Sequence, residues 1–226
     1  MVAPAGERVP LNLLRVMPAK ESVGANTRAN APLRITRDPA LRAGPRTRGR
    51  HVIIPNVLSI AAIDPSGGAG SFADLKTFAA LGAFGTGVVV ALTAQNTRAV
   101  TGIHEAPPEF TRLQIDTLFE DVRIDAVKIG ALVSAPIIRM VAERLRHWRP
   151  PFIVLDPVMV AKSGDRLLRA DAVQALRDEL LPLATVVTPN LPEAGDLVGR
   201  EVTEAPGDMR AAARALIEMG AQHALV

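Results

Sequence analysis

The run NVLSIAAIDPSGGAGSFADLKTFAAL, over residues 56–81, constrains the fold of this chain more than any other stretch. Residues 57–63 carry no charge and are almost entirely apolar, which is typical of a parallel strand buried on both faces. The segment DPSGGAG follows, and its glycines permit backbone conformations that other residues avoid. From Ser71 onwards, apolar residues recur at helical spacing. The run therefore predicts a strand, a glycine-rich turn and a helix.

The predicted turn places Asp64 at the carboxyl end of a strand, facing the free N–H groups of a helix start, where open parallel sheets bind ligands. The alternative is that Asp64 only caps its own turn. The run lacks the third glycine of G-x-G-x-x-G and contains no Gly-Lys-Ser/Thr. Neither a dinucleotide fingerprint nor a Walker A loop is therefore predicted.

The remainder of the domain alternates between buried strands and amphipathic helices. Strands are expected at 85–92, 125–129, 152–155, 185–187 and 224–226, with a short lid or edge strand at 101–104. Helices are expected at 109–119, 136–148, 171–180, 193–198 and 208–219, the third and fifth of these capped by Asp171 and Asp208. This alternation predicts an α/β fold, a mostly parallel sheet with helices on both faces.

Four polar residues each follow a predicted strand directly: Asp64, Gln95, Asp156 and Asn190. The carboxyl ends of parallel strands meet at one edge of a sheet, and such sheets place their chemistry there. We therefore expect these four side chains to share one edge.

Charge divides the chain into two parts. Residues 1–50 contain nine Arg and one Lys against three acidic residues, a net charge of +7, so the remaining residues carry a net charge of −4. The first part is rich in Pro, Arg, Ala and Gly without periodicity, and we expect it to be a disordered basic extension. Residues 51–226 are expected to form one mildly acidic domain, which argues against a nucleic-acid partner and favours small molecules.

Cysteine is absent from the sequence, which excludes disulfides, thiolate metal sites and a cysteine nucleophile, and is compatible with the cytoplasm. The apolar runs are too short to span a bilayer, so no membrane partner is expected. The four histidines show no metal-ligand spacing and are expected to be bystanders.

The segment DPSGGAG, followed by ADLKTFAALGAFG, resembles the N-terminal signature of the hydroxymethylpyrimidine/phosphomethylpyrimidine kinases of thiamine biosynthesis, in the ribokinase-like superfamily. Later segments agree in order and spacing, and the resemblance covers about residues 56–226: ALTAQNT (91–97), DVRIDAVKIG (121–130), VLDPVMVAKSGDRLL (154–168) and TPNLPEA (188–194). It implies a ribokinase-like domain and ATP-dependent phosphorylation of 4-amino-5-hydroxymethyl-2-methylpyrimidine and its monophosphate, with Mg²⁺. A pyridoxal or pyridoxine kinase of the same superfamily is the alternative.

The resemblance implies that the substrate contacts Asp64, Gln95, Val158 and Gly130. On their own chemistry, Asp64 could accept hydrogen bonds from a ring amine, and Gln95 can both donate to and accept from an aminopyrimidine edge. The alternative for Gln95 is a side chain that ties down a loop.

Phosphate and metal ligands are expected from the last two of these segments, 154–168 and 188–194. Asp156 could hold a metal through water, and Lys162, in a Ser-Gly loop, could fold over nucleotide phosphates. Asn190 and Glu193 form an N-x-x-E pattern at a helix start, which the resemblance associates with phosphate and Mg²⁺. The metal would lie with Asp156 and Glu193. The alternative is that Glu193 only complements the helix dipole.

Three other charged residues lie in the earlier segments ADLKTFAALGAFG and DVRIDAVKIG. Asp74 and Lys76 fit an exposed pair on a solvated helix face. Lys128, near a strand end, is expected either to reach an anion or to extend its charge to solvent at the sheet edge.

The chain departs from the family pattern at Ala62, Ile63 and Ala131, which leaves the preference between pyrimidine and pyridoxal open. Family members also continue into a Lys-Gly-Gly-His segment and a Gly-Thr-Gly-Cys loop that forms the anion hole, which would lie beyond Val226. The sequence is therefore expected to be truncated at the C-terminus, with no catalytic residue assigned and weak or no activity, or to be a non-catalytic pyrimidine-binding fragment. A homodimer is expected only because family members are commonly dimers.

Overall fold

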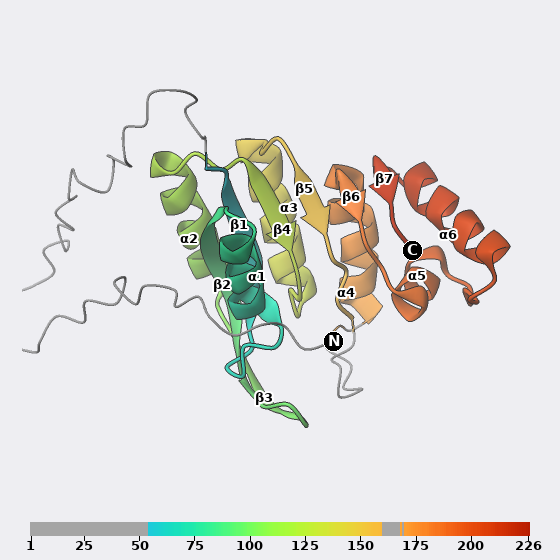
Figure 1. Ribbon diagram of the computed structural model, residues 1–226, viewed down its shortest axis with the longest axis horizontal. Helices are drawn as coiled ribbons and strands as arrows, with labels where there is room; N and C mark the ends of the chain where they lie inside the picture. The colour runs from blue at the N-terminus through green and yellow to red at the C-terminus, as the bar shows by residue number, and fades with distance from the viewer. Residues whose placement is uncertain (1–53, 160–167, 169) are drawn as a thin grey trace, which may run out of the picture. The chain divides into compact units, whose positions relative to one another are not determined.

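A computed structural model describes residues 54–159, 168 and 170–226. The predicted extension at 1–50 and the predicted phosphate ligand Lys162 lie outside these residues. Seven strands form one sheet in the order β3-β2-β1-β4-β5-β6-β7 (Figure 1). The strands are β1 (Asn56–Ile63), β2 (Phe84–Gln95), β3 (Val100–Glu105), β4 (Ala126–Ile129), β5 (Ile153–Leu155), β6 (Val186–Val187) and β7 (His223–Ala224).

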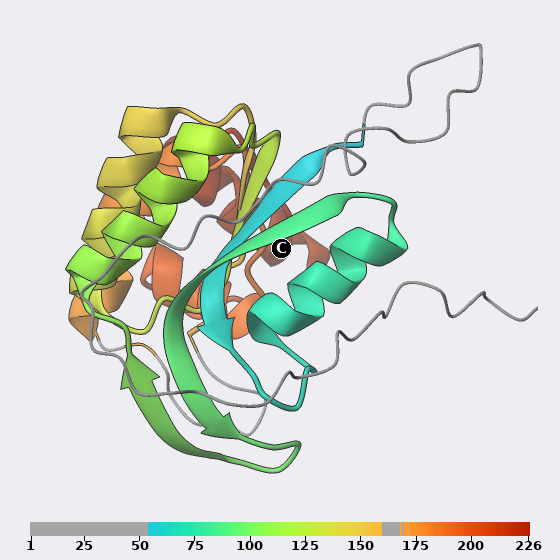
Figure 2. The same cartoon turned by 90° about the vertical axis from the view of Figure 1, so that its left-hand side faces the viewer.

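All neighbouring strands pair in parallel except β2 and β3, which are antiparallel. The mostly parallel sheet predicted from the sequence is thereby confirmed. The described helices are α1 (Gly70–Ala80), α2 (Pro108–Asp121), α3 (Ala135–Trp148), α4 (Ala170–Ala175), α5 (Leu191–Val198) and α6 (Pro206–Glu218). Helix α1 covers one face of the sheet, and α2 and α3 pack together on the other (Figure 2).

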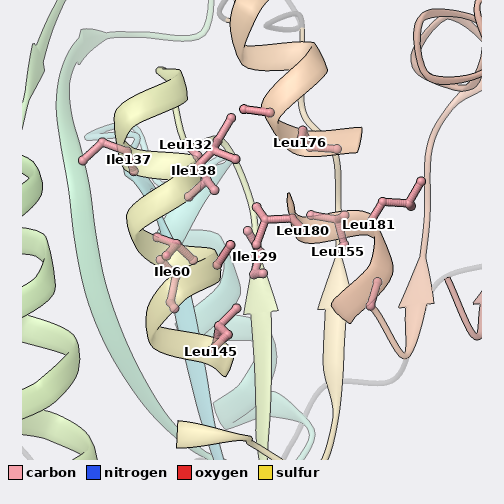
Figure 3. Close-up of a cluster of buried hydrophobic side chains, with 14 of the residues drawn as sticks. Ile60, Ile129, Leu132, Ile137, Ile138, Leu145, Leu155, Leu176, Leu180 and Leu181 are labelled. Carbon is pink, nitrogen blue, oxygen red and sulfur yellow. The ribbon is translucent and has the colours of Figure 1, made fainter. Parts of the chain in front are cut away.

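The core lies where α3 and the segment after α4 pack on the central strands (Figure 3). Ile60 of β1 is fully buried, as the uncharged pattern of residues 57–63 predicts, and Ile129 of β4 is fully buried too. The helix predicted at 136–148 is amphipathic, as expected, and the apolar stripe that it buries in α3 includes Ile137, Ile138, Val141 and Leu145. Burial of this stripe holds the helix against the sheet.

Strand β2 is longer than the predicted 85–92, because β3 pairs with its last five residues from Ala91 to Gln95. Gln95 is therefore the last residue of a strand and not the first residue after one. Just before this pairing begins, the side-chain amide of Gln114 in α2 accepts from Val89 N at 3.1 Å and donates to Val89 O at 3.0 Å. This amide satisfies backbone groups that would otherwise lack partners.

Two predicted helix caps are wrong. Asp171 lies inside the first turn of α4, which begins at Ala170, and Asp208 lies inside the first turn of α6, whose N-cap is Ala205. The carboxylate of Asp208 instead accepts hydrogen bonds from the backbone N–H of Thr203 and the guanidinium of Arg200. The single helix predicted at 171–180 continues from α4 through a π-helical turn (Leu176–Leu180) and a 3-10 turn (Leu181–Leu183).

The strand order reverses at the centre of the sheet. From β1 the chain moves to β2 on one side, and α2 then carries it back to β4 on the other side of β1. In open α/β sheets, ligands bind in the crevice at the carboxyl ends of the strands where the order reverses. The topology therefore places a binding crevice beside the ends of β1 and β4.

Candidate functional site

A cavity of about 570 Å³ opens at the carboxyl ends of β1, β2, β4, β5 and β6, within the range of small-molecule sites. Asp64 and Gln95 both line it, so the two residues predicted to share a site do share one. Its other polar or charged side chains are Ser66, Asp74, Thr93, Asn96, Thr97, Arg98, Lys128, Asp156, Thr188, Asn190 and Glu193. The cavity therefore combines apolar strand ends with a rim rich in carboxylates.

Asp64 holds the glycine-rich turn together. Its Oδ1 accepts from Ser66 N at 2.8 Å, and its Oδ2 accepts from Ser66 Oγ at 2.8 Å and from Gly68 N at 3.2 Å. Burial of Asp64 would raise the pKa of its carboxyl, but the hydrogen bonds from Ser66 and Gly68 outweigh burial, and the pKa lies below its usual value. The side chain is thus an ionised turn cap at the cavity wall. A contact between Asp64 and substrate stays a prediction.

The hairpin of β2 and β3 carries Gln95 into the cavity wall. Thr93 lies two residues earlier on β2. Its hydroxyl oxygen is 2.9 Å from the carbonyl oxygen of Ile63 and 3.2 Å from Gln95 Oε1. At the hairpin tip, Asn96 Oδ1 accepts from the backbone N–H groups of Arg98 and Ala99, so the side chain of Asn96 closes the turn.

Lys128 joins two carboxylates at the cavity. Its Nζ lies 3.2 Å from Asp74 Oδ1 and 3.1 Å from Asp156 Oδ2. Ser59 Oγ, buried in β1, also donates to Asp74 Oδ2 at 2.7 Å. The interpretation of Asp74 as part of an exposed pair is therefore wrong, since its side chain is only 15% exposed. Lys76, its expected partner, donates instead to the carbonyl of Gly67.

Sequence reasoning did not assign Asp74 a place in the site, although a signal was present. Asp74 lies three residues after Ser71 on α1, so both point to the same face of the helix. That face meets Ser59, whose hydroxyl also lies 3.4 Å from Ser71 Oγ. Two serines in otherwise apolar contact surfaces indicate a buried polar partner.

Gly130 does not line the cavity, unlike the other three predicted substrate contacts, Asp64, Gln95 and Val158. A Cβ at position 130 would lie 3.0 Å from Lys128 Nζ and 3.1 Å from Ala61 Cβ. The missing side chain therefore gives the ammonium of Lys128 the room to reach its two carboxylates. Gly130 therefore affects the site indirectly, through the position of Lys128.

Asn190 and Glu193 form a capping box at the start of α5. Asn190 Oδ1 accepts from Glu193 N at 2.9 Å, and Glu193 Oε2 accepts from Asn190 N at 3.0 Å. Glu193 is only 6% exposed. Burial raises the pKa of its carboxyl, and the negative charge of Asp156 raises it further, against the hydrogen bonds from Asn190 and Met159.

The residues present fit a water-mediated divalent cation. Within residues 54–159, 168 and 170–226, no three His, Asp or Glu side chains are grouped so that they could hold a metal by themselves. Mg²⁺, however, is commonly held by one or two carboxylates, waters and the phosphates of a substrate. Asp156 and Glu193 line the same cavity, so the two carboxylates could share such a cation. Burial is the main cause of the raised pKa of Glu193, and the negative charge of Asp156 adds to it.

Glu193→Gln is expected to change how stability depends on pH. The pKa of the Glu193 carboxyl is raised in the folded protein, so the folded state binds the carboxyl proton more tightly than the unfolded state does. The contribution of Glu193 to the free energy of unfolding is therefore lost as pH rises through the folded pKa. The variant lacks this loss, which is at most about 1.4 kcal/mol per pH unit. Urea unfolding of both proteins at pH 5 and pH 8 should show Glu193→Gln gaining relative stability at pH 8. A constant difference would contradict this prediction.

The sheet order, the cavity where that order reverses and the carboxylates that line it define a small-molecule site of an open, mostly parallel α/β sheet. The chain belongs to the phosphomethylpyrimidine kinase family, whose model matches residues 64–226. The hydroxymethylpyrimidine/phosphomethylpyrimidine kinase of Escherichia coli strain K12 is 50% identical over 165 residues, covering 73% of this chain and 62% of that protein. The chain thus spans about 62% of the length of this relative.

Solved structures agree with this family. A phosphomethylpyrimidine kinase from Clostridium difficile 630 superimposes with a TM-score of 0.70 at 41% identity, covering 74% of this chain and 72% of that one. The pyridoxal kinase of Staphylococcus aureus in complex with ADP gives a TM-score of 0.69 at 36% identity, covering 76% and 62%. The ribokinase-like fold expected from the sequence is therefore confirmed.

Proposed function

We propose that this chain supplies the substrate site of an ATP-dependent kinase that phosphorylates 4-amino-5-hydroxymethyl-2-methylpyrimidine and its monophosphate in thiamine biosynthesis. One observation carries the proposal: Gln95, suited to an aminopyrimidine edge, lines the same cavity as Asp156 and Glu193, which are suited to a phosphate-bound cation. A kinase needs these two kinds of chemistry side by side.

Each group has a separate task in this proposal. The amide of Gln95 orients the ring, and Asp64 holds the turn that closes the cavity beside it. Asp156 and Glu193 would hold Mg²⁺, which when bound neutralises the phosphate oxygens of ATP. Lys128 and Arg98 are the cationic side chains that line the cavity among the described residues, and they complement an anionic substrate. Lys162 stays a prediction.

Pyridoxal kinase is a second candidate, because pyridoxal kinases of 35–36% identity share the fold with TM-scores of 0.69–0.70. The two candidates differ in the ring that the cavity accepts. An aminopyrimidine offers an exocyclic amine, whereas pyridoxal offers a hydroxyl and an aldehyde, so Gln95 would pair with different groups.

Calorimetry of this chain with each ligand tests the proposal. The aminopyrimidine alcohol is expected to bind more tightly than pyridoxal, and Gln95→Leu is expected to weaken its binding about tenfold or more, since the amide hydrogen bonds are lost. Gln174→Leu is the matched control, because Gln174 is exposed on α4 and its amide donates only to Asp178 in the described structure. Tighter binding of pyridoxal, or an unchanged affinity in Gln95→Leu, would contradict the proposal.

Phosphoryl transfer from ATP to the alcohol is measured on the same sample, with and without Mg²⁺, by following the phosphorylated pyrimidine. Among the described helices, none combines the length and the apolar character needed to cross a membrane. A cytoplasmic location and a homodimer stay predictions.

A further inference from the structure

We propose that Thr93 sets the specificity of the cavity by fixing which end of the Gln95 amide faces the ligand. This inference rests on the proposed function, since it concerns how a heterocycle is recognised. Thr93 and Gln95 are two residues apart on β2, and although the pairing with β3 is irregular between Ala94 and Gln95, their side chains are in contact, with Thr93 Oγ1 3.2 Å from Gln95 Oε1. Both line the cavity.

The hydroxyl of Thr93 can donate one hydrogen bond, and two oxygen atoms are close enough to accept it. The carbonyl oxygen of Ile63 lies at 2.9 Å and Gln95 Oε1 at 3.2 Å. Ile63 is the last residue of β1 and forms a bridge with Gly70, so its carbonyl is held in place by the backbone at the end of the strand. The shorter contact, to this fixed carbonyl, takes the hydrogen.

With its hydrogen on Ile63, Thr93 can offer only lone pairs to Gln95. An amide oxygen facing those lone pairs is unfavourable, whereas the amide NH₂ facing them forms a hydrogen bond. The two ends of a glutamine amide are nearly the same shape, and their assignment follows from the hydrogen-bond partners. Rotating the amide by half a turn therefore directs Nε2 to Thr93 and Oε1 into the cavity.

This orientation makes Gln95 an acceptor towards the ligand. An acceptor pairs with the exocyclic amine of an aminopyrimidine and opposes a ring carbonyl at the same position, because two acceptors then face each other. Thr93 is thus a positioning residue: it acts on the ligand through Gln95. Without the hydroxyl, the amide can rotate freely and serve either ligand.

Two pyrimidines that differ at a single position test the inference. One is the 4-amino alcohol and the other is its 4-oxo analogue, each titrated into the full chain by calorimetry. Thr93→Val removes the hydroxyl and keeps the side-chain shape, and it should lower the amino-over-oxo affinity ratio about tenfold. Thr93→Ser should restore the ratio to within about threefold of the wild type, since the hydroxyl returns.

Thr101→Val is the matched control. Thr101 lies on β3 of the same hairpin, is exposed and donates to the carbonyl of Ala94, and it does not line the cavity. Its variant should keep the wild-type ratio. If Thr93→Val weakens both ligands equally, Thr93 has only a structural role and the inference is overturned. If the wild type binds the 4-amino alcohol and the 4-oxo analogue equally tightly, the inference is also overturned, while the proposed function survives.

A second measurement needs no ligand. In ¹⁵N-labelled protein, the side-chain NH₂ signal of Gln95 is identified by its loss in Gln95→Leu. Thr93→Val should shift this signal, because the N–H loses its hydroxyl acceptor, and Thr101→Val should not. An unshifted Gln95 signal in Thr93→Val overturns the inference, whether or not the wild type binds a pyrimidine. If the wild type binds neither pyrimidine, that result contradicts the proposed function and not the inference.

Discussion

Gly70→Ala is expected to destabilise the domain by about 3 kcal/mol or more, or to prevent folding. Gly70 is the first residue of α1 and has a φ of +58°, and a Cβ there would lie 2.2 Å from the carbonyl oxygen of Ala62. That carbonyl belongs to buried backbone of β1 and cannot move aside without opening the turn. The substitution therefore combines a left-handed backbone penalty with a collision against a strand.

Gly82→Ala separates these two costs. Gly82 has a φ of +77°, but no described atom lies within 4 Å of the position its Cβ would take. Only the backbone penalty remains, and the expected loss is about 1 kcal/mol. Urea unfolding of the two variants measures the difference. Equal losses would show that the turn can rearrange around Ala62 and would refute the collision.

Lys128→Met is expected to lower stability by about 2 kcal/mol and to weaken binding of phosphorylated ligands at least tenfold. The Lys128 side chain is 20% exposed and pairs with Asp74 and Asp156, and without its ammonium two neighbouring carboxylates lie with no cation between them. Partial exposure reduces the cost below that of a fully buried pair. An anionic ligand additionally meets a more negative cavity, whereas a neutral ligand does not.

Calorimetry compares the neutral pyrimidine alcohol with its monophosphate in wild type and Lys128→Met. The affinity of the alcohol should change less than about threefold, while that of the phosphate falls at least tenfold. Lys76→Met is the matched control, because Lys76 is exposed on α1 and its ammonium donates to the Gly67 carbonyl without lining the cavity. Equal losses for both ligands would show that Lys128 acts on the shape of the cavity and not on its charge.

Several parts of the site follow from sequence because they depend on local pattern. The uncharged strand and the glycine-rich turn predicted the position of Asp64, and strand alternation predicted that Gln95, Asp156 and Asn190 would gather at one edge, where they line one cavity. The N-x-x-E pattern is a local signal too, and it forms a capping box at Asn190. Such features are set within a few residues of chain.

Other parts required the three-dimensional arrangement. The end of β2 lay beyond the predicted limit because the pairing of β3 extends it, and antiparallel pairing of an edge strand leaves little periodic signal in the sequence. Asp74 has the pattern of a solvated helix face, but α1 lies across β1 and buries that face against Ser59. The surroundings of a helix face are a tertiary property, which local sequence does not encode.

The amino-acid sequence alone determined the kind of fold and the strand ends at which chemistry collects, because hydrophobic periodicity and turn residues act over short distances. Only the tertiary structure decided which charges meet. It brought Lys128 of β4 between Asp74 of α1 and Asp156 of the loop after β5, and the absence of a side chain at Gly130 leaves space for that ammonium. The physical reason is that ion pairs and close packing depend on distances of a few ångströms between segments far apart in the chain.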